Sequence, residues 1–280
     1  MFKAPLDLAK CRILVSNDDG IDANGIKLLE RVARTLSDDV WVVAPETEQS
    51  AVSHSLTVRT PLRIRTRDER HFAVNGTPTD AVLLAVTHIL KDHAPDLVLS
   101  GVNRGGNLGE DVTYSGTIAA AMEGTLLGVP SIALSQYVAE ETKRTPWAVA
   151  ERHAADVIRT LVSVAWPKGV LINVNFPDVP ADRVKGVAVT SQGRRKPGGE
   201  LDRRLDPRGV PYFWVATLRT EEPTRPGSDL AAVLQGSIAV TPLSTDLTHR
   251  PTLATLEDAF GAVEDVSGAL KDASGTGAGA

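Results

Sequence analysis

The sequence has one cysteine, no long apolar run and no excess of positive charge, and each shortage excludes a class of protein. The lone Cys11 excludes an intrachain disulfide framework and any zinc site built from cysteines. No apolar run approaches the ~20 residues that a transmembrane helix needs, and the N-terminus has no secretory signal pattern. A formal net charge of −5 gives no support to a general nucleic-acid or membrane-surface binder. We therefore expect a cytoplasmic protein whose partners include neither a membrane nor a nucleic-acid polymer.

The residues that are present have the composition of a globular protein, and their pattern indicates an α/β fold. The chain has 280 residues, of which 42% are hydrophobic and 23% charged, enough for one large domain or for one domain with an accessory part. An apolar run at 13–15 predicts a buried strand, helical spacing at 26–36 predicts a helix, and a second apolar run follows at 40–45. Strand, helix and strand in this order form a βαβ unit, which implies a parallel sheet.

The rest of the chain extends this unit into a Rossmann-like, mostly parallel sheet flanked by helices. Further strands are predicted at 96–100, 129–135, 170–177 and 237–243, with a half-exposed strand at 56–64. Helices are predicted after an N-cap at Thr79 and at 116–127, 147–164, 229–235 and 253–270. Residues 177–223 are rich in Arg, Gly and Pro and predict hairpins outside the sheet. We expect a catalytic core at 10–175, accessory hairpins, a return strand and a C-terminal helix at 176–270, and a disordered tail at 271–280.

The first predicted strand ends in Asn17-Asp18-Asp19-Gly20, which has two interpretations. Adjacent carboxylates at the end of a buried strand repel each other and are costly to desolvate, and a cation would remove both penalties. Hard cations such as Mg²⁺, Mn²⁺ or Ca²⁺ prefer such oxygen ligands. The same four residues are also good turn formers, and Asp often caps a following helix. This stretch alone favours neither a metal site nor a plain turn.

A glycine-rich segment at 100–109 follows the predicted strand at 96–100, as phosphate-binding loops do. It matches neither GxGxxG nor the P-loop pattern. Its glycines, with Gly105 among them, let backbone N–H groups approach a ligand, and Arg104 can bind a phosphate with two hydrogen bonds. Asn103 can give a neutral oxygen to a metal, and Asn107 adds a side-chain amide. The alternative is a long loop without a ligand.

A helix starts at Ser115-Gly116-Thr117, where exposed N–H groups and the helix dipole favour an anion. Its alternative interpretation is a conventional N-cap at Ser115 or Thr117.

The ends of parallel strands share one edge of a sheet, so these segments are expected to meet there. Two carboxylates, a hydroxyl and an amide then form an all-oxygen metal site, whose ligands are Asp18, Asp19, Ser50 and Asn103. Of these, Asp18, Asp19 and Asn103 are also the expected catalytic residues. The residues expected to hold phosphate are Asn17, Arg104, Gly105, Asn107, Ser115, Gly116 and Thr117. A metal beside a phosphate site indicates phosphoryl chemistry.

In order along the chain, the motifs resemble those of the SurE (survival protein E) family of nucleotidases. The matching stretches are ILVSNDDGI at 13–21, VAP at 43–45, QSA at 49–51, HSLT at 54–57, GTPTD at 76–80, SGVNRGGN at 100–107, YSGT at 114–117, NVN at 173–175 and SIAVTPL at 237–243. Two departures are visible. Ser53 stands where the family's stretch has glycine, and residues 271–280 extend past the usual end.

The resemblance implies a metal-dependent phosphatase acting on nucleoside 5′- and 3′-monophosphates, and on short-chain polyphosphate as a further substrate. It places the metal, Mg²⁺ or Mn²⁺, on Asp18, Asp19, Ser50 and Asn103. It also implies a C-terminal part that exchanges elements between subunits of a dimer or tetramer.

We expect a metal-activated water to attack phosphorus in line; the alternative is an aspartyl-phosphate on Asp18 or Asp19. His54 is a weaker candidate for a proton shuttle, or a packing residue. Tyr212, Phe213 and Trp214 are expected to pack in the accessory region. Two other protein classes compete, a non-catalytic phosphate-binding module and a nucleotide-cofactor oxidoreductase. The adjacent carboxylates argue against the first, and the lack of GxGxxG after the first strand against the second.

Overall fold

The computed structural model describes residues 1–139, 147–197, 201–215, 219–221 and 224–260. Contacts divide the chain into two units, Met1–Thr245 and Asp246–Ala280. The described part of the second unit contains one helix, α6 (Arg250–Phe260). No helix among the described residues has the length and apolarity required to cross a membrane.

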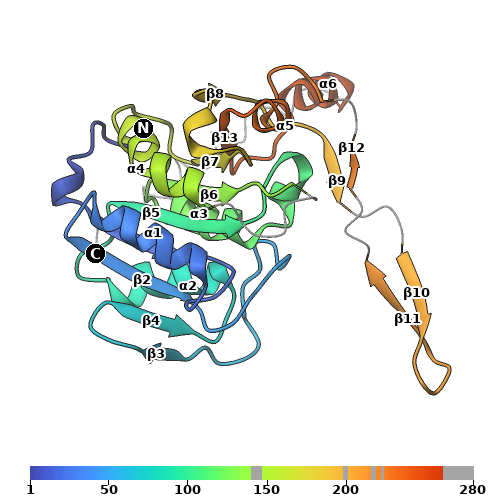
Figure 1. Cartoon of the computed structure of the whole chain (residues 1–280), viewed down its shortest axis with the longest axis horizontal. Coiled ribbons are helices and arrows are strands. Elements are labelled where there is room, and N and C mark those ends of the chain that lie inside the picture. The colour runs from blue at the N-terminus through green and yellow to red at the C-terminus, as the bar shows by residue number, and fades with distance from the viewer. Residues whose placement is uncertain (140–146, 198–200, 216–218, 222–223, 261–280) are drawn as a thin grey trace, which may run out of the picture. The chain divides into compact units, whose positions relative to one another are not determined.

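The first unit is built on a nine-stranded sheet with the order β3-β4-β2-β1-β5-β6-β7-β13-β8 (Figure 1). Its strands pair in parallel, except that β3 runs antiparallel to β4 and β13 antiparallel to β7. The prediction of a mostly parallel α/β sheet is therefore confirmed. The strands are β1 (Arg12–Ser16), β2 (Asp39–Pro45), β3 (Ile64–Thr66), β4 (His71–Val74), β5 (Leu97–Arg104), β6 (Ser131–Gln136), β7 (Val170–Phe176), β8 (Val187–Val189) and β13 (Ile238–Ser244).

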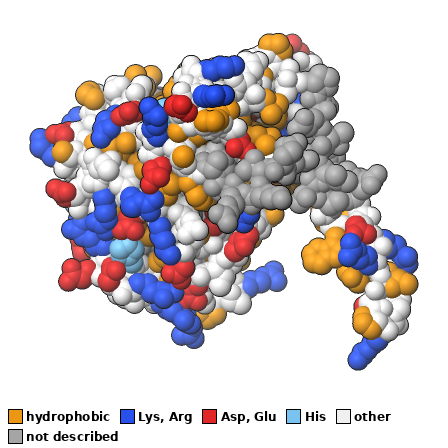
Figure 2. All heavy atoms as spheres, viewed as in Figure 1, with side chains coloured by type: hydrophobic (Ala, Val, Ile, Leu, Met, Phe, Trp, Pro, Cys, Tyr) orange, Lys and Arg blue, Asp and Glu red, His pale blue; other side chains and the backbone are white. Residues whose placement is uncertain are grey.

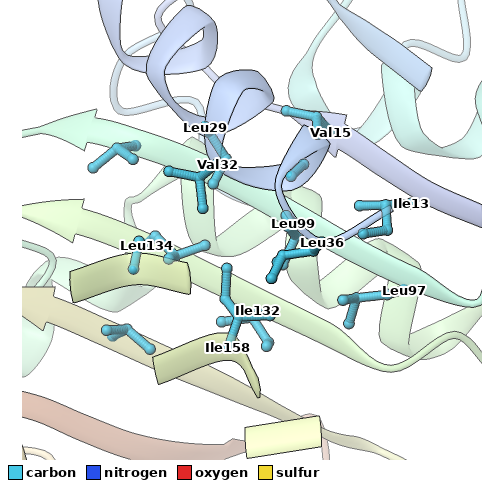
Figure 3. Packing of buried hydrophobic residues seen from close by; sticks show 14 of the residues in the cluster. Ile13, Val15, Leu29, Val32, Leu36, Leu97, Leu99, Ile132, Leu134 and Ile158 are labelled. Atoms are coloured by element: carbon cyan, nitrogen blue, oxygen red, sulfur yellow. The ribbon is translucent and has the colours of Figure 1, made fainter. Parts of the chain in front are cut away.

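Helices cover both faces of this sheet because side chains alternate along each strand. Ile13 and Val15 of β1 point to a core shared with α1 (Asn24–Arg34) and α4 (Ala148–Val162) (Figure 3). Leu14, between them, joins a second core with α2 (Pro78–Leu84) and α3 (Gly116–Leu126). A strand buried on both faces reads as a continuous apolar run, which is why the run at 13–15 was a dependable signal.

The order of the strands places a crevice between β1 and β5. From β1 the chain crosses to β2 on one side, and after β4 it returns by α2 to β5 on the other side of β1. Such a switch point opens a crevice beyond the carboxyl ends of the two strands, where ligands bind in open α/β sheets. The crevice therefore lies beside the residues that follow the register pair Ser16 of β1 and Ser100 of β5.

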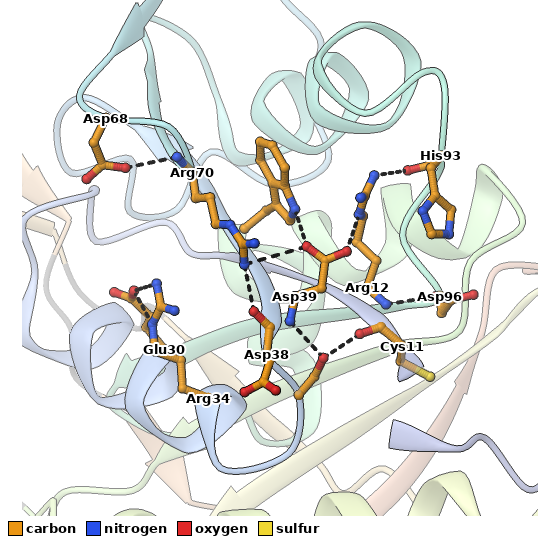
Figure 4. A network of polar contacts seen from close by, with 12 residues as sticks. Cys11, Arg12, Glu30, Arg34, Asp38, Asp39, Asp68, Arg70, His93 and Asp96 are labelled. Atoms are coloured by element: carbon orange, nitrogen blue, oxygen red, sulfur yellow. Dashed lines mark hydrogen bonds and ion pairs between the residues drawn. The ribbon is translucent and has the colours of Figure 1, made fainter. Parts of the chain in front are cut away.

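The opposite ends of β1 and β2 are joined by a polar network around Asp39 (Figure 4). Arg12 Nε donates to one carboxylate oxygen of Asp39 at 2.8 Å, and the indole N–H of Trp41 donates to the other at 2.7 Å. The backbone N–H of Arg12 donates to Asp96 at 2.8 Å, which adds the start of β5. These contacts fix the register of the strands from the end remote from the crevice.

The accessory region contains the predicted hairpins and also contributes to the main sheet. The strand β9 (Arg195–Pro197) pairs antiparallel with β12 (Arg219–Glu221), and β10 (Leu201–Leu205) with β11 (Pro211–Val215). The strands β8 and β13 of this region lie in the nine-stranded sheet, and β13 occupies the place of the predicted return strand. The short helix α5 (Asp229–Leu234) packs on β13. The predicted tail at 271–280 lies outside the described residues.

Several predicted boundaries were wrong for identifiable reasons. Residues 56–63 form no strand, and only Ile64–Thr66 pairs, because Thr57 in the segment before it is hydrogen-bonded to Asp80 of α2. The N-cap of α2 is Thr77 and not Thr79, since Thr77 accepts from the Asp80 N–H in a capping box and Pro78 begins the helix. The strand β5 continues to Arg104, so half of the predicted glycine loop is strand.

The α2 helix is followed by a short π-helix (Ala85–Ile89). Short 3₁₀ helices occur at Leu8–Lys10, Gly109–Thr113 and Ala181–Arg183.

Candidate metal and phosphate site

The two aspartates after β1 lie in different surroundings. Asp18 is buried, and its Oδ1 accepts a hydrogen bond from the Thr117 hydroxyl at 2.5 Å. Asp19 is half-buried and accepts a 3.4 Å hydrogen bond from the backbone N–H of Arg104. The fold therefore brings the residues after β1 into contact with both the end of β5 and the start of α3. This agrees with the prediction that these segments meet at one edge of the sheet.

The start of α3 approaches Asp18 closely because residue 116 is glycine. A Cβ atom at Gly116 would lie 2.6 Å from the Asp18 Cβ and 3.0 Å from its Oδ2. The positive end of the helix dipole then lies beside a carboxylate, which favours its ionised form. Gly116 and Thr117 thus contact the metal-ligand candidate Asp18, and their binding of phosphate stays a prediction.

Burial is the main cause that raises the pKa of Asp18 to about 7; the Thr117 hydrogen bond opposes this shift, and the charge of Asp19 adds to it. Burial also raises the pKa of Asp19, where the Arg104 N–H opposes the shift and the nearby Glu48 charge adds to it. The protein alone therefore disfavours two ionised carboxylates at this place.

The loop after β2 brings Ser50 to the same edge. The Gln49 N–H donates to the backbone carbonyl of Asp18 at 2.8 Å, so the loop is attached directly to the aspartate turn. The Ser50 side chain is exposed, and its hydroxyl donates to Glu48 at 2.8 Å. A hydroxyl oxygen that donates its proton keeps lone pairs for a cation.

A bulge in β5 supplies the remaining ligand candidate. Register with β6 shifts between Ser100 and Asn103, where Gly101 has φ +129°. A Cβ atom at Gly101 would lie 2.2 Å from the Leu134 carbonyl oxygen, so the close approach of the two strands requires glycine. Bulges turn a side chain out of its regular direction. Asn103 is half-buried, and its Nδ2 donates to the Gly105 carbonyl at 2.9 Å, so its Oδ1 stays available for a cation.

These residues fit a divalent cation on two observations. First, within the described part of the chain neither Asp18 nor Asp19 forms an ion pair with a Lys or Arg side chain, so the buried Asp18 has no cationic partner and Asp19 has only the more distant charge of Arg104. Second, the Asn17 Oδ1 is buried beside them and has no hydrogen-bond partner among the residues that the structure describes. Carboxylate, hydroxyl and amide oxygens are the donor set of Mg²⁺ or Mn²⁺.

Among the residues predicted to hold phosphate, one is a cation without an ion pair to the described residues, and several others make hydrogen bonds within the protein. Arg104 is exposed and forms no ion pair with any described residue. The Gly105 N–H donates to the Gln136 carbonyl at 3.0 Å. Asn17 Nδ2 donates to the Gly20 carbonyl at 2.9 Å, which confirms that Asn17 shapes the turn. Ser115 accepts from the Ile118 N–H at 3.1 Å and is the N-cap of α3, the alternative left open above.

Two buried acidic residues that the sequence did not single out hold the Ser50 loop. The Nε2 of His54 lies 2.8 Å from a carboxylate oxygen of Glu123 on α3. Asp80 of α2 accepts from the N–H and the hydroxyl of Thr57 at 3.0 and 2.6 Å. His54 is therefore engaged as a loop anchor. A carboxylate inside an apolar helix pattern was the signal that could have revealed Glu123 and Asp80.

Comparison with known proteins assigns the family. The family model described as Survival protein SurE matches residues 13–198, two thirds of the chain and all of the candidate site residues. The chain belongs to the SurE family.

Relatives resemble this SurE protein over nearly their whole length. It is 60% identical over 259 residues to a protein named 5′-nucleotidase SurE from Paramagnetospirillum magneticum, covering 92% of this chain and 99% of that one. A protein of the same name from Rhodospirillum rubrum is 56% identical, with 93% and 100% covered. The crystal structure of the SurE protein from Aquifex aeolicus superposes with a TM-score of 0.76 at 39% identity, over 88% of this chain and 98% of that chain. The predicted family and fold are thus confirmed.

Proposed function

We propose that this SurE protein is a metal-dependent 5′-nucleotidase that hydrolyses nucleoside monophosphates to nucleoside and phosphate. The observation that carries the proposal is the Asp18–Asp19 pair, which forms no ion pair among the described residues, with the exposed Arg104 beside it at one crevice of the sheet. The names of the two bacterial relatives support the same activity.

Asp18, Asp19, Ser50 and Asn103 would hold the cation, Mg²⁺ or Mn²⁺. When bound, the cation supplies charge neutralisation for the phosphate and an activated water. The protein's own part is to position these groups: Thr117 and the start of α3 orient Asp18, and the Arg104 N–H orients Asp19. The Arg104 guanidinium provides two parallel hydrogen-bond donors for phosphate oxygens.

Asp18 is poorly placed to act as a covalent nucleophile. One of its oxygens accepts from Thr117, and the side chain is buried against Gly116. Asp19 is the more exposed of the two. Hydrolysis by water, without an aspartyl-phosphate, is therefore the favoured route, and acid-quench trapping of a phosphorylated Asp18 or Asp19 would overturn it.

The deciding experiment measures phosphate release from AMP and from 3′-AMP. Activity is expected with the purified protein, is abolished by EDTA and returns with Mn²⁺ or Mg²⁺. Binding of AMP without turnover under every metal condition would instead support a phosphate-binding module. Activity on 3′-AMP and on short-chain polyphosphate, as well as the identity of the metal, are further parts of the proposal that the same assay measures.

We also propose self-association and a cytoplasmic location. The β10–β11 hairpin exposes Leu201, Leu205, Phe213 and Val215 in the single chain. The register pairs Leu201 with Val215 and Arg203 with Phe213, so these apolar side chains share one face of the hairpin. An exposed apolar face of this kind is a candidate for a second copy of the chain. The lone, buried Cys11 suits a reducing compartment.

A further inference from the structure

Three asparagines and a serine form a buried cluster behind the glycine-rich loop that follows β5. Asn173 and Asn175 lie two residues apart on β7, so their side chains leave the same face of the strand, and both are fully buried. Asn107 is buried within the loop, and Ser135 is buried on the neighbouring strand β6. Buried amides are costly unless they are hydrogen-bonded, so the purpose of the cluster lies in its contacts.

The side chains of β7 hold the backbone of Asn107 on both sides. The Asn107 N–H donates to the Asn175 Oδ1 at 2.8 Å. The Asn107 carbonyl accepts from the Nδ2 of Asn173 at 2.8 Å and from the Nδ2 of Asn175 at 3.1 Å. The Nδ2 of Asn175 also lies 3.2 Å from the Asn173 Oδ1, which orients the two amides relative to each other. One loop residue therefore has its backbone donor and acceptor bound by side chains.

The neighbouring loop residues are held in the same manner. The Asn107 Nδ2 donates to the Ser135 hydroxyl at 2.8 Å, and the Gly105 N–H donates to the Gln136 carbonyl at 3.0 Å. The Gly109 N–H donates at 2.9 Å to the buried carboxylate of Asp229. The loop is thus attached at 105, 107 and 109 to β6, β7 and α5, elements that carry none of the proposed metal ligands.

We propose that Asn175, together with Asn173, is a positioning residue that acts through the Asn107 backbone to fix Arg104 and Gly105 where the substrate phosphate binds. This inference rests on the proposed function. Residues 104–109 contain three glycines, which by themselves hold no single conformation. Fixing such a loop in advance removes the cost of ordering it when a ligand binds. The clamp therefore serves phosphate affinity. Asp18 and Ser50 lie on other segments and share no hydrogen bond with described residues of the loop, whereas Asp19 and Asn103 each share one, with Arg104 and Gly105.

The test compares phosphate and metal affinity in Asn175→Ala. Titration calorimetry of the Mn²⁺-loaded protein with inorganic phosphate is expected to show a dissociation constant raised roughly 10-fold. KM for AMP rises by a similar factor, while kcat changes less. The Mn²⁺ dissociation constant is expected to stay within about 3-fold of the wild-type value, because Asp18 and Ser50 share no hydrogen bond with described residues of the loop, and Asp19 and Asn103 each share only one. Ser135→Ala, which loosens the loop from its other side, is expected to give a smaller change in the same direction.

A matched control separates positioning from a general loss of stability. Thr241 of β13 pairs in register with Asn173, is buried, and shares a 2.7 Å hydrogen bond with Thr190, while its side chain makes no hydrogen bond to the described residues of the loop. Thr241→Val therefore removes a buried polar contact one strand away and is expected to lower the melting temperature while KM and phosphate affinity remain unchanged.

Hydrogen exchange of the amides at 104–109 gives a reading that does not need catalysis. Exchange of this segment is expected to accelerate in Asn175→Ala and to remain unchanged in Thr241→Val. Unchanged loop exchange and phosphate affinity in Asn175→Ala, or a loss of Mn²⁺ affinity as large as the loss of phosphate affinity, would overturn the inference. A wild-type protein without phosphate release would overturn the proposed function alone, since the exchange comparison would still decide the role of Asn175.

Discussion

At the scale of single residues, the unequal surroundings of two adjacent aspartates are the main feature. Asp18 is buried against Gly116 and Thr117, whereas Asp19 stays half-exposed beside Arg104. Adjacent residues at a strand end point in different directions, so one carboxylate enters the protein and the other faces the crevice. Asp18 is buried without a cationic partner. Its carboxylate therefore lowers the stability of the metal-free protein, although it is a proposed metal ligand.

Asp18→Asn is expected to change activity and stability in opposite directions. Phosphate release from AMP falls at least about 100-fold, because a ligand contributes more than the second-sphere contacts whose loss costs 10–100-fold. In the metal-free protein at pH 8 the free energy of unfolding rises by roughly 2–4 kcal/mol, because the amide removes a buried carboxylate whose pKa burial has raised to about 7. Activity assays and chemical denaturation with EDTA measure the two effects.

The control for this variant is Asp22→Asn in the same loop. Asp22 is exposed and lies 3.6 Å from Arg67, so its replacement is expected to leave both quantities nearly unchanged. Normal turnover by Asp18→Asn would refute the metal-site assignment.

The residue types at the site followed from the sequence, but the role of each could not. Carboxylate, hydroxyl and amide side chains at or after strand ends predicted that Asp18, Asp19, Ser50 and Asn103 form one site. Helix capping and anion binding use the same side chains, so the pattern could not distinguish a capping Ser115 from a phosphate-binding one. That distinction depends on contacts between segments far apart in the sequence.

At the scale of elements, the Ser50 loop explains the departure at residue 53. Ser53 has φ +56°, in the left-handed region that glycine adopts without strain. Its hydroxyl donates to the Thr113 carbonyl at 2.8 Å, and its N–H donates to the Tyr114 carbonyl at 3.1 Å. The serine therefore offsets backbone strain with a side-chain hydrogen bond that glycine could not make.

Substitutions at Ser53 are expected to separate these two contributions. Ser53→Ala loses the hydrogen bond to Thr113 and keeps the strained φ, while Ser53→Gly loses the hydrogen bond and relieves the strain. Ser53→Gly should therefore be more stable than Ser53→Ala by about 1 kcal/mol, with KM for AMP closer to that of the unchanged protein. Urea denaturation and steady-state kinetics of the two variants test this order, and the reverse order would contradict it.

The Asp39 network gives the junction of β1 and β2 a defined acid sensitivity. Burial alone would raise the pKa of Asp39, but the hydrogen bonds from Arg12 and Trp41 outweigh it and hold the pKa below the usual 3.8. A lowered pKa in the folded state means that the ionised carboxylate stabilises the fold above about pH 4 and that this contribution is lost as the pH falls further.

Asp39→Asn is expected to lower the free energy of unfolding at pH 7 by about 1–2 kcal/mol, since the ion pair is partly exposed. The difference from the unchanged protein should shrink below pH 4, as measured by urea denaturation across pH 3–7. Asp38→Asn is the matched control, because among the described residues the Asp38 carboxylate makes no hydrogen bond or ion pair. A difference that stays constant down to pH 3 would contradict the linkage.

Elements buried on both faces were predictable, whereas edge and loop segments were not. The strands β1, β5 and β6 are continuous apolar runs because a strand that is buried on both faces needs apolar side chains on each face. Residues 56–63 alternate like a strand, yet the Thr57 N–H donates to the Asp80 carboxylate and the carbonyl of the preceding Ser55 accepts from the Thr77 hydroxyl, in place of strand pairing. The pairing partner of an edge segment depends on tertiary structure, and the alternation of apolar and polar residues does not reveal it.

At the scale of the whole molecule, the β10–β11 hairpin is the feature of the described residues that indicates self-association, because its apolar side chains are exposed in the single chain. Figure 2 shows hydrophobic side chains among arginines on this hairpin, and Phe213 and Trp214 are 54% and 61% exposed. The sequence predicted that Tyr212, Phe213 and Trp214 pack within the accessory region. In the single chain the rings of Tyr212 and Trp214 contact each other edge to face with their centroids 6.5 Å apart, but the side chains stay largely exposed, because two strands alone have no second layer to cover them.

Leu205→Ser combined with Phe213→Ser is expected to convert the assembly into monomers. Both side chains belong to the apolar face of the hairpin, so their replacement removes the surface that self-association would bury. Sedimentation velocity would show a dimer or tetramer for the unchanged protein. Arg204→Ser, on the opposite face, should keep the assembly, and a monomeric unchanged protein would refute the proposal.

The separation of the metal ligands from the loop clamp along the chain has a consequence for biosynthesis. Asp18, Ser50 and Asn103 leave the ribosome before β6 is complete, whereas Asn175 and Asp229 follow much later. At translation rates of roughly 5–20 residues per second, several seconds pass between the last ligand and the first clamp residue. A nascent chain therefore has every proposed metal ligand before it can fix the phosphate loop, so cation loading can precede substrate recognition during synthesis.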